Sequence, residues 1–141
     1  MRLGWQRLVL AALFAAASGC GSSSSTPTTP TTAATTTDTF TGSVAQSGAD
    51  FHVFAVAANG PVAITLTSVS PLATMSLGVS VATSDGTSCL ATITQNADAR
   101  SGNVALQAAA ATTGSYCVQV YDSGNIPSGT TVGYTLQVLH P

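Results

Sequence analysis

The histidines available as a base for a hydroxyl nucleophile in this chain are His52 and His140. Serine and threonine are abundant, but a hydroxyl nucleophile needs an adjacent base and a third group that orients the base. His52 lies in a stretch typical of a strand, at the expected margin of the core, and His140 stands at the expected frayed C-terminal end. No G-x-S-x-G, H-E-x-x-H or phosphate-binding glycine motif occurs. We therefore predict a protein that is not an enzyme and needs no cofactor. The open alternative is a catalytic triad of a serine, His52 and an aspartate, brought together from distant positions in the chain.

Cys89 and Cys117 are the thiols with the simplest interpretation. Two cysteines in an exported domain are expected to form a disulfide, which here closes a loop of 29 residues, counting both ends. A reactive thiol or a metal-binding pair is the alternative, although no Lys, Arg or His stands close in sequence to lower a thiol pKa. Strand alternation points Cys117 away from Tyr116 and Val118, so the bridge is expected on the outer face of a sheet or at a loop.

The third cysteine, Cys20, follows a segment typical of a secretory signal peptide. Arg2 and Arg7 precede an apolar run of about ten residues, which is too short for a transmembrane helix of ~20 residues. The sequence ASGC resembles a bacterial lipobox, whose cysteine carries the lipid of the mature protein. This resemblance implies an exported protein anchored by lipid in the bacterial cell envelope, and Gly21 after the cysteine implies the outer membrane. Cleavage by an ordinary signal peptidase is the alternative.

The segment after Cys20 has the composition of a tether. Residues 21–37 contain only Gly, Ser, Thr, Pro and Ala. Such a segment buries too little apolar surface to offset the entropy of ordering, so it is expected to be disordered. We therefore divide the chain into a lipoprotein signal peptide at residues 1–19, a tether at 20–38 that begins with lipidated Cys20, and a folded domain at 39–141.

The charge balance of the chain disfavours nucleic acid and anionic lipid as partners. Charged residues make up 6% of the chain, against a usual ~25%, and Lys and Glu are absent. Beyond the signal segment, one Arg and five Asp give a formal charge of −4. This balance disfavours nucleic acid, whose phosphates need basic partners, and it disfavours a polybasic contact with anionic lipid. We expect a monomer that contacts the membrane through its N-terminal lipid.

The residues after Thr39 show the period of two that is typical of strands. Apolar and polar residues alternate most clearly from Met75 to Val81, and no helical periodicity competes with this pattern. Alanines at 105–111 would also suit a helix, but the flanking strands favour a strand there. Turn residues separate the runs, which predicts an all-β antiparallel sandwich or barrel. About eight strands are expected, at 40–44, 51–57, 62–66, 75–81, 89–94, 104–109, 116–121 and 134–138.

Four stretches carry a family resemblance: TFTGSVAQSGADFHVFAVAANGPVAITL, VATSDGTSCLA, TTGSYCVQVYDSG and VGYTLQV. In order and spacing they resemble the bacterial pre-peptidase C-terminal domain, from Thr39 to Leu139. The resemblance implies an antiparallel jelly-roll-like β-sandwich. It also implies a core that contains Phe54, Tyr116, Val118, Val120, Tyr134 and Leu136, and periodicity supports the last five. The clustered acidic ligands of calcium-binding relatives are missing, so no metal site is expected.

Binding is the expected function, and Tyr121 is the leading ligand residue. Alternation points it away from Tyr116 and Val118, so its ring is expected to stack on a ligand, or alternatively to cover a neighbouring loop. Asp122 and Asn125, in the connection that follows, are expected to supply hydrogen bonds beside it. One hypothesis is a tethered module that binds a polysaccharide or an envelope protein; the resemblance favours it, since that family usually accompanies secreted hydrolases. The other is a passive structural envelope lipoprotein without a specific ligand.

Overall fold

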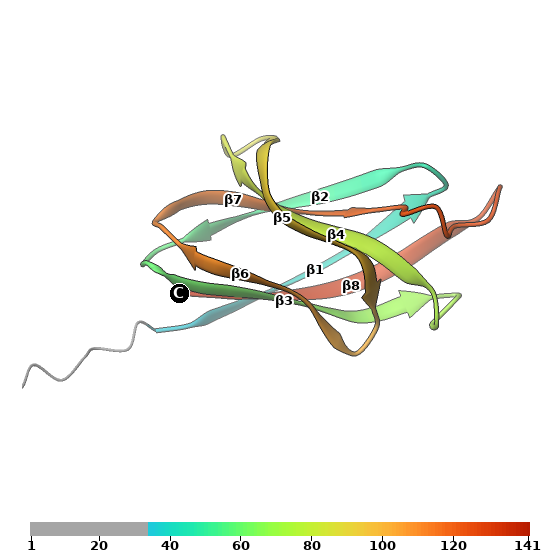
Figure 1. Ribbon diagram of the computed structural model, residues 1–141, viewed down its shortest axis with the longest axis horizontal. Coiled ribbons are helices and arrows are strands. Elements are labelled where there is room, and N and C mark those ends of the chain that lie inside the picture. Colours follow the sequence, from blue (N-terminus) through green and yellow to red (C-terminus); the bar gives the residue numbers. More distant parts are fainter. Residues whose placement is uncertain (1–33) are drawn as a thin grey trace, which may run out of the picture. The chain divides into compact units, whose positions relative to one another are not determined.

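Two antiparallel four-stranded sheets face each other in the folded part of the chain (Figure 1). The computed structural model describes residues 34–141, except for the side chains of residues 108–110. The strands are β1 (Thr36–Ala45), β2 (Ala49–Val56), β3 (Gly60–Ser70), β4 (Ser76–Ser84), β5 (Cys89–Arg100), β6 (Asn103–Ala111), β7 (Gly114–Tyr121) and β8 (Thr131–His140). The expected all-β sandwich of eight strands is thus confirmed, including a strand in the alanine-rich segment. The predicted signal peptide, Cys20 and the predicted tether as far as residue 33 lie outside the described residues.

The strand order is that of a jelly roll. The first sheet has the order β1-β8-β3-β6, and the second sheet has the order β2-β7-β4-β5. Each connection passes from one sheet to the other, except the turn between β4 and β5, which are paired neighbours. This connectivity is the eight-stranded, two-sheet arrangement that the family resemblance implied.

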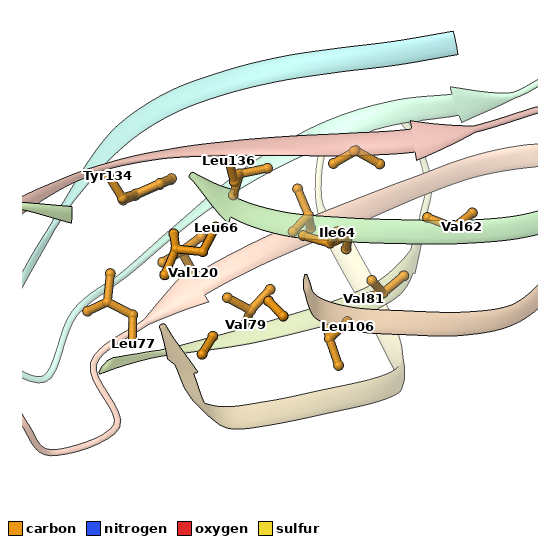
Figure 2. Close-up of a cluster of buried hydrophobic side chains, with 14 of the residues drawn as sticks. Val62, Ile64, Leu66, Leu77, Val79, Val81, Leu106, Val120, Tyr134 and Leu136 are labelled. Carbon is orange, nitrogen blue, oxygen red and sulfur yellow. The ribbon is translucent and has the colours of Figure 1, made fainter. Parts of the chain in front are cut away.

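The core lies between the inner faces of the two sheets (Figure 2). Alternation turns Leu77, Val79 and Val81 of β4 inward, and all three are fully buried. Full burial of such a side chain stabilises the fold by ~1.5–3 kcal/mol relative to exposure, so this interior supplies most of the driving force for folding. The predicted core residues are all buried: Phe54, Tyr116, Val118, Val120, Tyr134 and Leu136.

The connections gather at two opposite ends of the sandwich (Figure 1). One end, which we call the terminal end, holds the start of β1 and the C-terminus, because Thr36 pairs with His140. The other end, which we call the loop end, holds the connections at residues 46–48, 71–75 and 122–130. Since β1 runs from the terminal end to the loop end, the first strand begins at the end opposite these connections.

The start of the domain and the packing of its last residues differ from the sequence-based expectation. β1 begins at Thr36, so Thr36, Thr37 and Asp38 belong to the fold rather than to the tether. The prediction of a frayed end at His140 is wrong, because its side chain is 5% exposed and its Nε2 lies 3.1 Å from Asp38 Oδ2. β8 therefore pairs with β1 through His140, where the aspartate partner satisfies the ring.

Candidate functional site

The outer face of the second sheet carries the aromatic side chain that the sequence placed away from the core. Tyr121 of β7 lies on this face, and pairing sets Gly78 of β4 opposite it. A neighbouring row crosses β2, β7, β4 and β5 as Phe51, Gln119, Ser80 and Gln95. Paired residues point to the same side of a sheet, so Tyr121 and this row form one surface, which we call the polar–aromatic face. Phe51, 44% exposed, is its second aromatic residue.

The Tyr121 ring lies flat on Gly78. A Cβ at Gly78 would lie 2.6 Å from Cδ2 of the ring and closer still to Cε2 and Cζ. Because three adjacent ring atoms are this near, the ring covers the glycine with its face rather than its edge. The alternative role for Tyr121 was to cover a neighbouring loop, but its ring covers Gly78 of β4. The residue is partly exposed, and the opposite face of the ring points away from the sheet, as stacking on a ligand requires.

A pocket of about 310 Å³ opens at the loop end, next to the polar–aromatic face. Ser76 lies two residues before Gly78 on the same face of β4, so the pocket and the Tyr121 ring are neighbours along one strand. Asn125 forms part of the wall, and its Nδ2 donates to Ser76 Oγ at 3.0 Å. The pocket is lined by Leu72, Thr74, Met75, Ser76 and Asn125.

Asp122 shapes the loop after β7. Its Oδ2 accepts a hydrogen bond from the Ser47 backbone N–H at 2.8 Å, and its Oδ1 accepts from the N–H groups of Gly124, Asn125 and Ile126 at 2.8–3.1 Å. These hydrogen bonds, first of all the one from Ser47, lower the pKa of the Asp122 carboxyl below its ordinary value. Since backbone groups occupy the carboxylate, Asp122 organises the loop that carries Asn125 rather than offering its oxygens to a ligand.

Acid is expected to loosen this loop. A carboxyl with a lowered folded-state pKa stabilises the fold above its unfolded pKa of ~3.9, and this stabilisation is lost as the pH falls through the folded-state pKa. We therefore expect the hydrogen-exchange protection factors of Ser47, Gly124 and Ile126 to decrease below about pH 4. In Asp122→Asn, the same amides should be less protected at neutral pH and show no such decrease in acid. Constant protection of the wild-type loop in acid would contradict this role.

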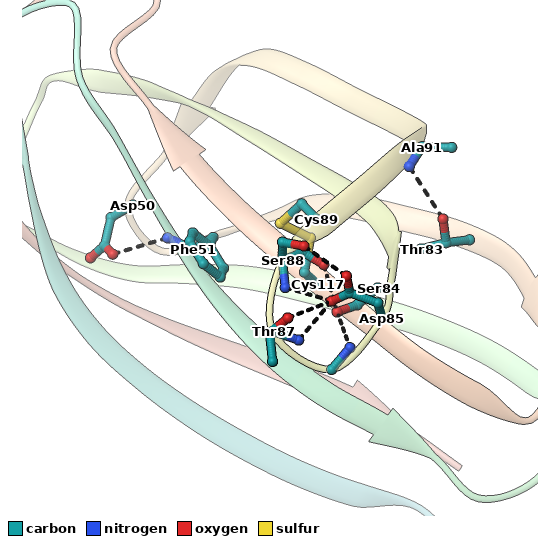
Figure 3. Close-up of a disulfide and its surroundings, with 11 residues drawn as sticks. Asp50, Phe51, Thr83, Ser84, Asp85, Thr87, Ser88, Cys89, Ala91 and Cys117 are labelled. Carbon is teal, nitrogen blue, oxygen red and sulfur yellow. Dashed lines mark hydrogen bonds between the residues drawn. A yellow bond between two sulfur atoms is a disulfide. The ribbon is translucent and has the colours of Figure 1, made fainter.

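Cys89 and Cys117 form the predicted disulfide, with their Cα atoms 5.6 Å apart. The bond joins the first residue of β5 to β7 across β4, on the outer side of the second sheet (Figure 3). In the adjoining turn, the Asp85 carboxylate accepts hydrogen bonds from the backbone N–H and the hydroxyl of both Thr87 and Ser88 at 2.8–2.9 Å. These hydrogen bonds, the Thr87 backbone first, lower the pKa of Asp85. The disulfide and the turn hold the end of β4 farthest from the pocket.

Each histidine lies near an aspartate: His52 Nε2 is 3.9 Å from Asp50 Oδ2, and His140 Nε2 is 3.1 Å from Asp38 Oδ2. Tyr134 donates its hydroxyl proton to Asp50 Oδ2 at 2.9 Å, so the Nε2–H of His52 is the donor in its 2.9 Å hydrogen bond to Tyr134 Oη. Burial, together with Asp50, raises the pKa of Tyr134 far above its ordinary value. Phe40 stacks on His52 with ring centroids 4.8 Å apart. The network joins β1, β2 and β8. The catalytic alternative required a serine hydroxyl beside His52, whereas the hydroxyl that contacts His52 belongs to Tyr134.

No protein-family model and no curated protein matches this chain. Within residues 34–141, no three side chains of His, Cys, Asp or Glu come together as a metal site. The same part of the chain has no helix that is long and apolar enough to cross a membrane. Function is therefore inferred from the geometry of the polar–aromatic face and the pocket.

The predicted site residues separate into two roles. Tyr121 and Asn125 lie on neighbouring parts of one surface, whereas Asp122 supports the loop between them. Sequence reasoning missed Gln119, although its spacing of two from Tyr121 already placed both on one face. It also missed Leu72, because no local pattern shows that the connection after β3 meets the loop after β7.

Proposed function

We propose that this protein is an exported, lipid-tethered, non-catalytic β-sandwich module that binds a polysaccharide on the outer face of its second sheet. The observation that carries this proposal is the Tyr121 ring, which lies flat on Gly78 and turns its other face outward. Aromatic faces stack on the apolar C–H faces of sugar rings, while polar groups around them bind the hydroxyls. Gln95 and Gln119 supply amide groups in the neighbouring row.

The chemistry of the polar–aromatic face favours a neutral polysaccharide over a protein partner. Stable protein interfaces bury ~800 Å² per partner around an apolar centre. Here Ser76, Gly78 and Ser80 of the central strand are buried, and the exposed or partly exposed groups beside them are the amides of Gln95 and Gln119 and the aromatic rings of Phe51 and Tyr121. Amide groups beside separate aromatic rings suit the hydroxyls and the C–H faces of a sugar chain.

The positions of the two ends support a tether at the N-terminus. β1 begins at the terminal end and runs for 10 residues, about 33 Å, toward the loop end. A lipid tether that ends at Thr36 would join the sandwich at the end opposite the pocket. Each buried methylene contributes ~0.8 kcal/mol, so several acyl chains make the attachment effectively permanent. The Cys89–Cys117 disulfide suits an oxidising compartment, and the jelly-roll order suits the proposed likeness to pre-peptidase C-terminal domains.

Removal of the Tyr121 ring is expected to weaken polysaccharide binding about tenfold or more. An array of neutral polysaccharides and oligosaccharides identifies a ligand, and isothermal titration then compares the variants. Tyr121→Ala loses the stacked ring, whereas Tyr121→Phe keeps it and should lose no more than about 1 kcal/mol, the usual net value of one hydrogen bond. The matched control is Gln137→Ala, on the outer face of the first sheet, which should leave affinity unchanged.

A silent array would overturn the binding function and favour a passive envelope lipoprotein. Equal affinity of Tyr121→Ala and wild type would move the site away from the polar–aromatic face. The tether is tested separately by mass spectrometry of the mature N-terminus, where acylated Cys20 is the expected first residue. An unmodified residue at that position would remove the lipid anchor while leaving the binding function intact.

A further inference from the structure

We propose that the pocket at the loop end recognises the acetamido group of an N-acetylated amino sugar. This inference rests on the proposed polysaccharide function and names the class of sugar chain. An acetamido group presents a methyl, an N–H and a carbonyl within a few bonds. A pocket that selects it needs an apolar wall for the methyl and polar groups that complement the amide.

The pocket provides both kinds of wall. Leu72 and Met75 line it with apolar side chains, while Thr74, Ser76 and Asn125 line it with hydroxyl and amide groups. Leu72 is 39% exposed, so part of its side chain is open to a ligand in the pocket. A methyl group placed against Leu72 and Met75 would remove apolar surface from water, which favours binding.

The amide of Asn125 is held in a defined orientation. Its Nδ2 donates to Ser76 Oγ at 3.0 Å and to Ser123 Oγ at 3.0 Å, with a longer contact of 3.4 Å to the Ser76 carbonyl. The amide group is planar, so its Oδ1 points away from these partners and can accept the N–H of an acetamido group. Asp122 fixes the backbone N–H of Asn125 at 2.9 Å, which leaves little freedom to lose on binding.

The size and place of the pocket fit one unit of a longer chain. Its volume of about 310 Å³ lies at the lower end of the range for ligand sites, ~300–1,000 Å³. Ser76 in its wall lies two residues, about 7 Å along β4, from the glycine beneath the Tyr121 ring. A sugar chain that stacks one unit on Tyr121 can therefore place a neighbouring unit in the pocket.

The charges nearby favour a neutral sugar of this class over an acidic one. Arg100, which pairs with Ser76 across the strands, is 3.1 Å from Asp98 and is neutralised by it. The part of the chain beyond the signal segment has a formal charge of −4, so polyanionic chains would be repelled. An acetamido group carries no charge, so it needs no free cationic partner and is not repelled by the negative domain.

Isothermal titration with chitohexaose and cellohexaose tests this inference. The two probes share one backbone and differ at each C2, where the first has an acetamido group and the second has a hydroxyl. We expect chitohexaose to bind at least tenfold more tightly to the wild-type protein. Leu72→Ser and Asn125→Ala should weaken chitohexaose more than cellohexaose and so reduce the selectivity at least severalfold, whereas Tyr121→Ala should weaken both. Leu72 and Asn125 are exposed, and thermal unfolding checks that their variants remain folded.

The outcomes separate the two proposals. Equal affinity for both hexasaccharides would overturn acetamido recognition and leave the polysaccharide function standing. Selectivity for chitohexaose that survives both Leu72→Ser and Asn125→Ala would place the recognition elsewhere. Binding of neither probe, together with a silent glycan array, would overturn both proposals.

Discussion

Loss of the Cys89–Cys117 disulfide is expected to lower the free energy of unfolding by about 3–4 kcal/mol, the chain-entropy value for a loop of this length. Domains of this size are stable by ~5–15 kcal/mol, so the bond accounts for a large share of the total. The mechanism acts mainly on the unfolded chain, which gains conformational freedom when residues 89 and 117 are no longer linked.

Urea unfolding of wild type and of the double variant Cys89→Ala/Cys117→Ala measures this effect. Cys117 is fully buried, so its truncation also removes packing contacts. The control is wild-type protein with a thiol reductant, which breaks the bond and keeps both sulfurs. Reductant should destabilise wild type and have no effect on the double variant. A change below about 1 kcal/mol on reduction would show that the sandwich does not depend on the bond.

Gly78→Ala is expected to remove most of the polysaccharide affinity while the fold stays intact. The new methyl would occupy the space beneath the Tyr121 ring, which must then leave its flat position on the sheet. The ring is the far end of a flexible side chain, so its displacement costs little folding free energy. Alanine also loses less conformational freedom than glycine in a strand, by ~0.5–1 kcal/mol. The substitution therefore separates the orientation of the ring from the stability of the domain.

Affinity of Gly78→Ala should fall about tenfold or more, to the level of Tyr121→Ala. The free energy of unfolding should stay within about 1 kcal/mol of wild type. The double variant Gly78→Ala/Tyr121→Ala should bind the polysaccharide no more weakly than either single variant, because both substitutions remove the same stacking surface. Gly133→Ala on β8 is the matched control, since its Cβ would meet its nearest neighbours at an ordinary 3.8 Å. Full affinity in Gly78→Ala would refute the role of the flat ring.

Strand positions followed from local pattern wherever a strand has one buried and one outer face. β8 alternates regularly between buried and outer positions, and the expected strand at 134–138 lies within it. β4 alternates in residue type although both of its faces are buried, and it was expected at 75–81 and lies at Ser76–Ser84. β5 was expected to end at residue 94 but extends to Arg100. It is an edge strand with three register shifts against β4, and each shift breaks the period of two on which the prediction depends.

The candidate site was predictable only as far as the direction of side chains along one strand. The outward direction of Tyr121 followed from its place in β7. The role of Asp122 did not, because its hydrogen-bond partner Ser47 is 75 residues away. The burial of His140 was missed for the same reason, since Asp38 is 102 residues away.

By itself, the sequence determined the period of two, the position of most strands, the low charge and the pair of cysteines available for a disulfide. These properties depend on residues that are neighbours in the chain. Tertiary structure alone decided that a glycine of β4 lies beneath the Tyr121 ring, and that two loops meet to form the pocket. The physical reason is that strand order and register arise from packing of the whole core, so contacts between distant segments have no local signal.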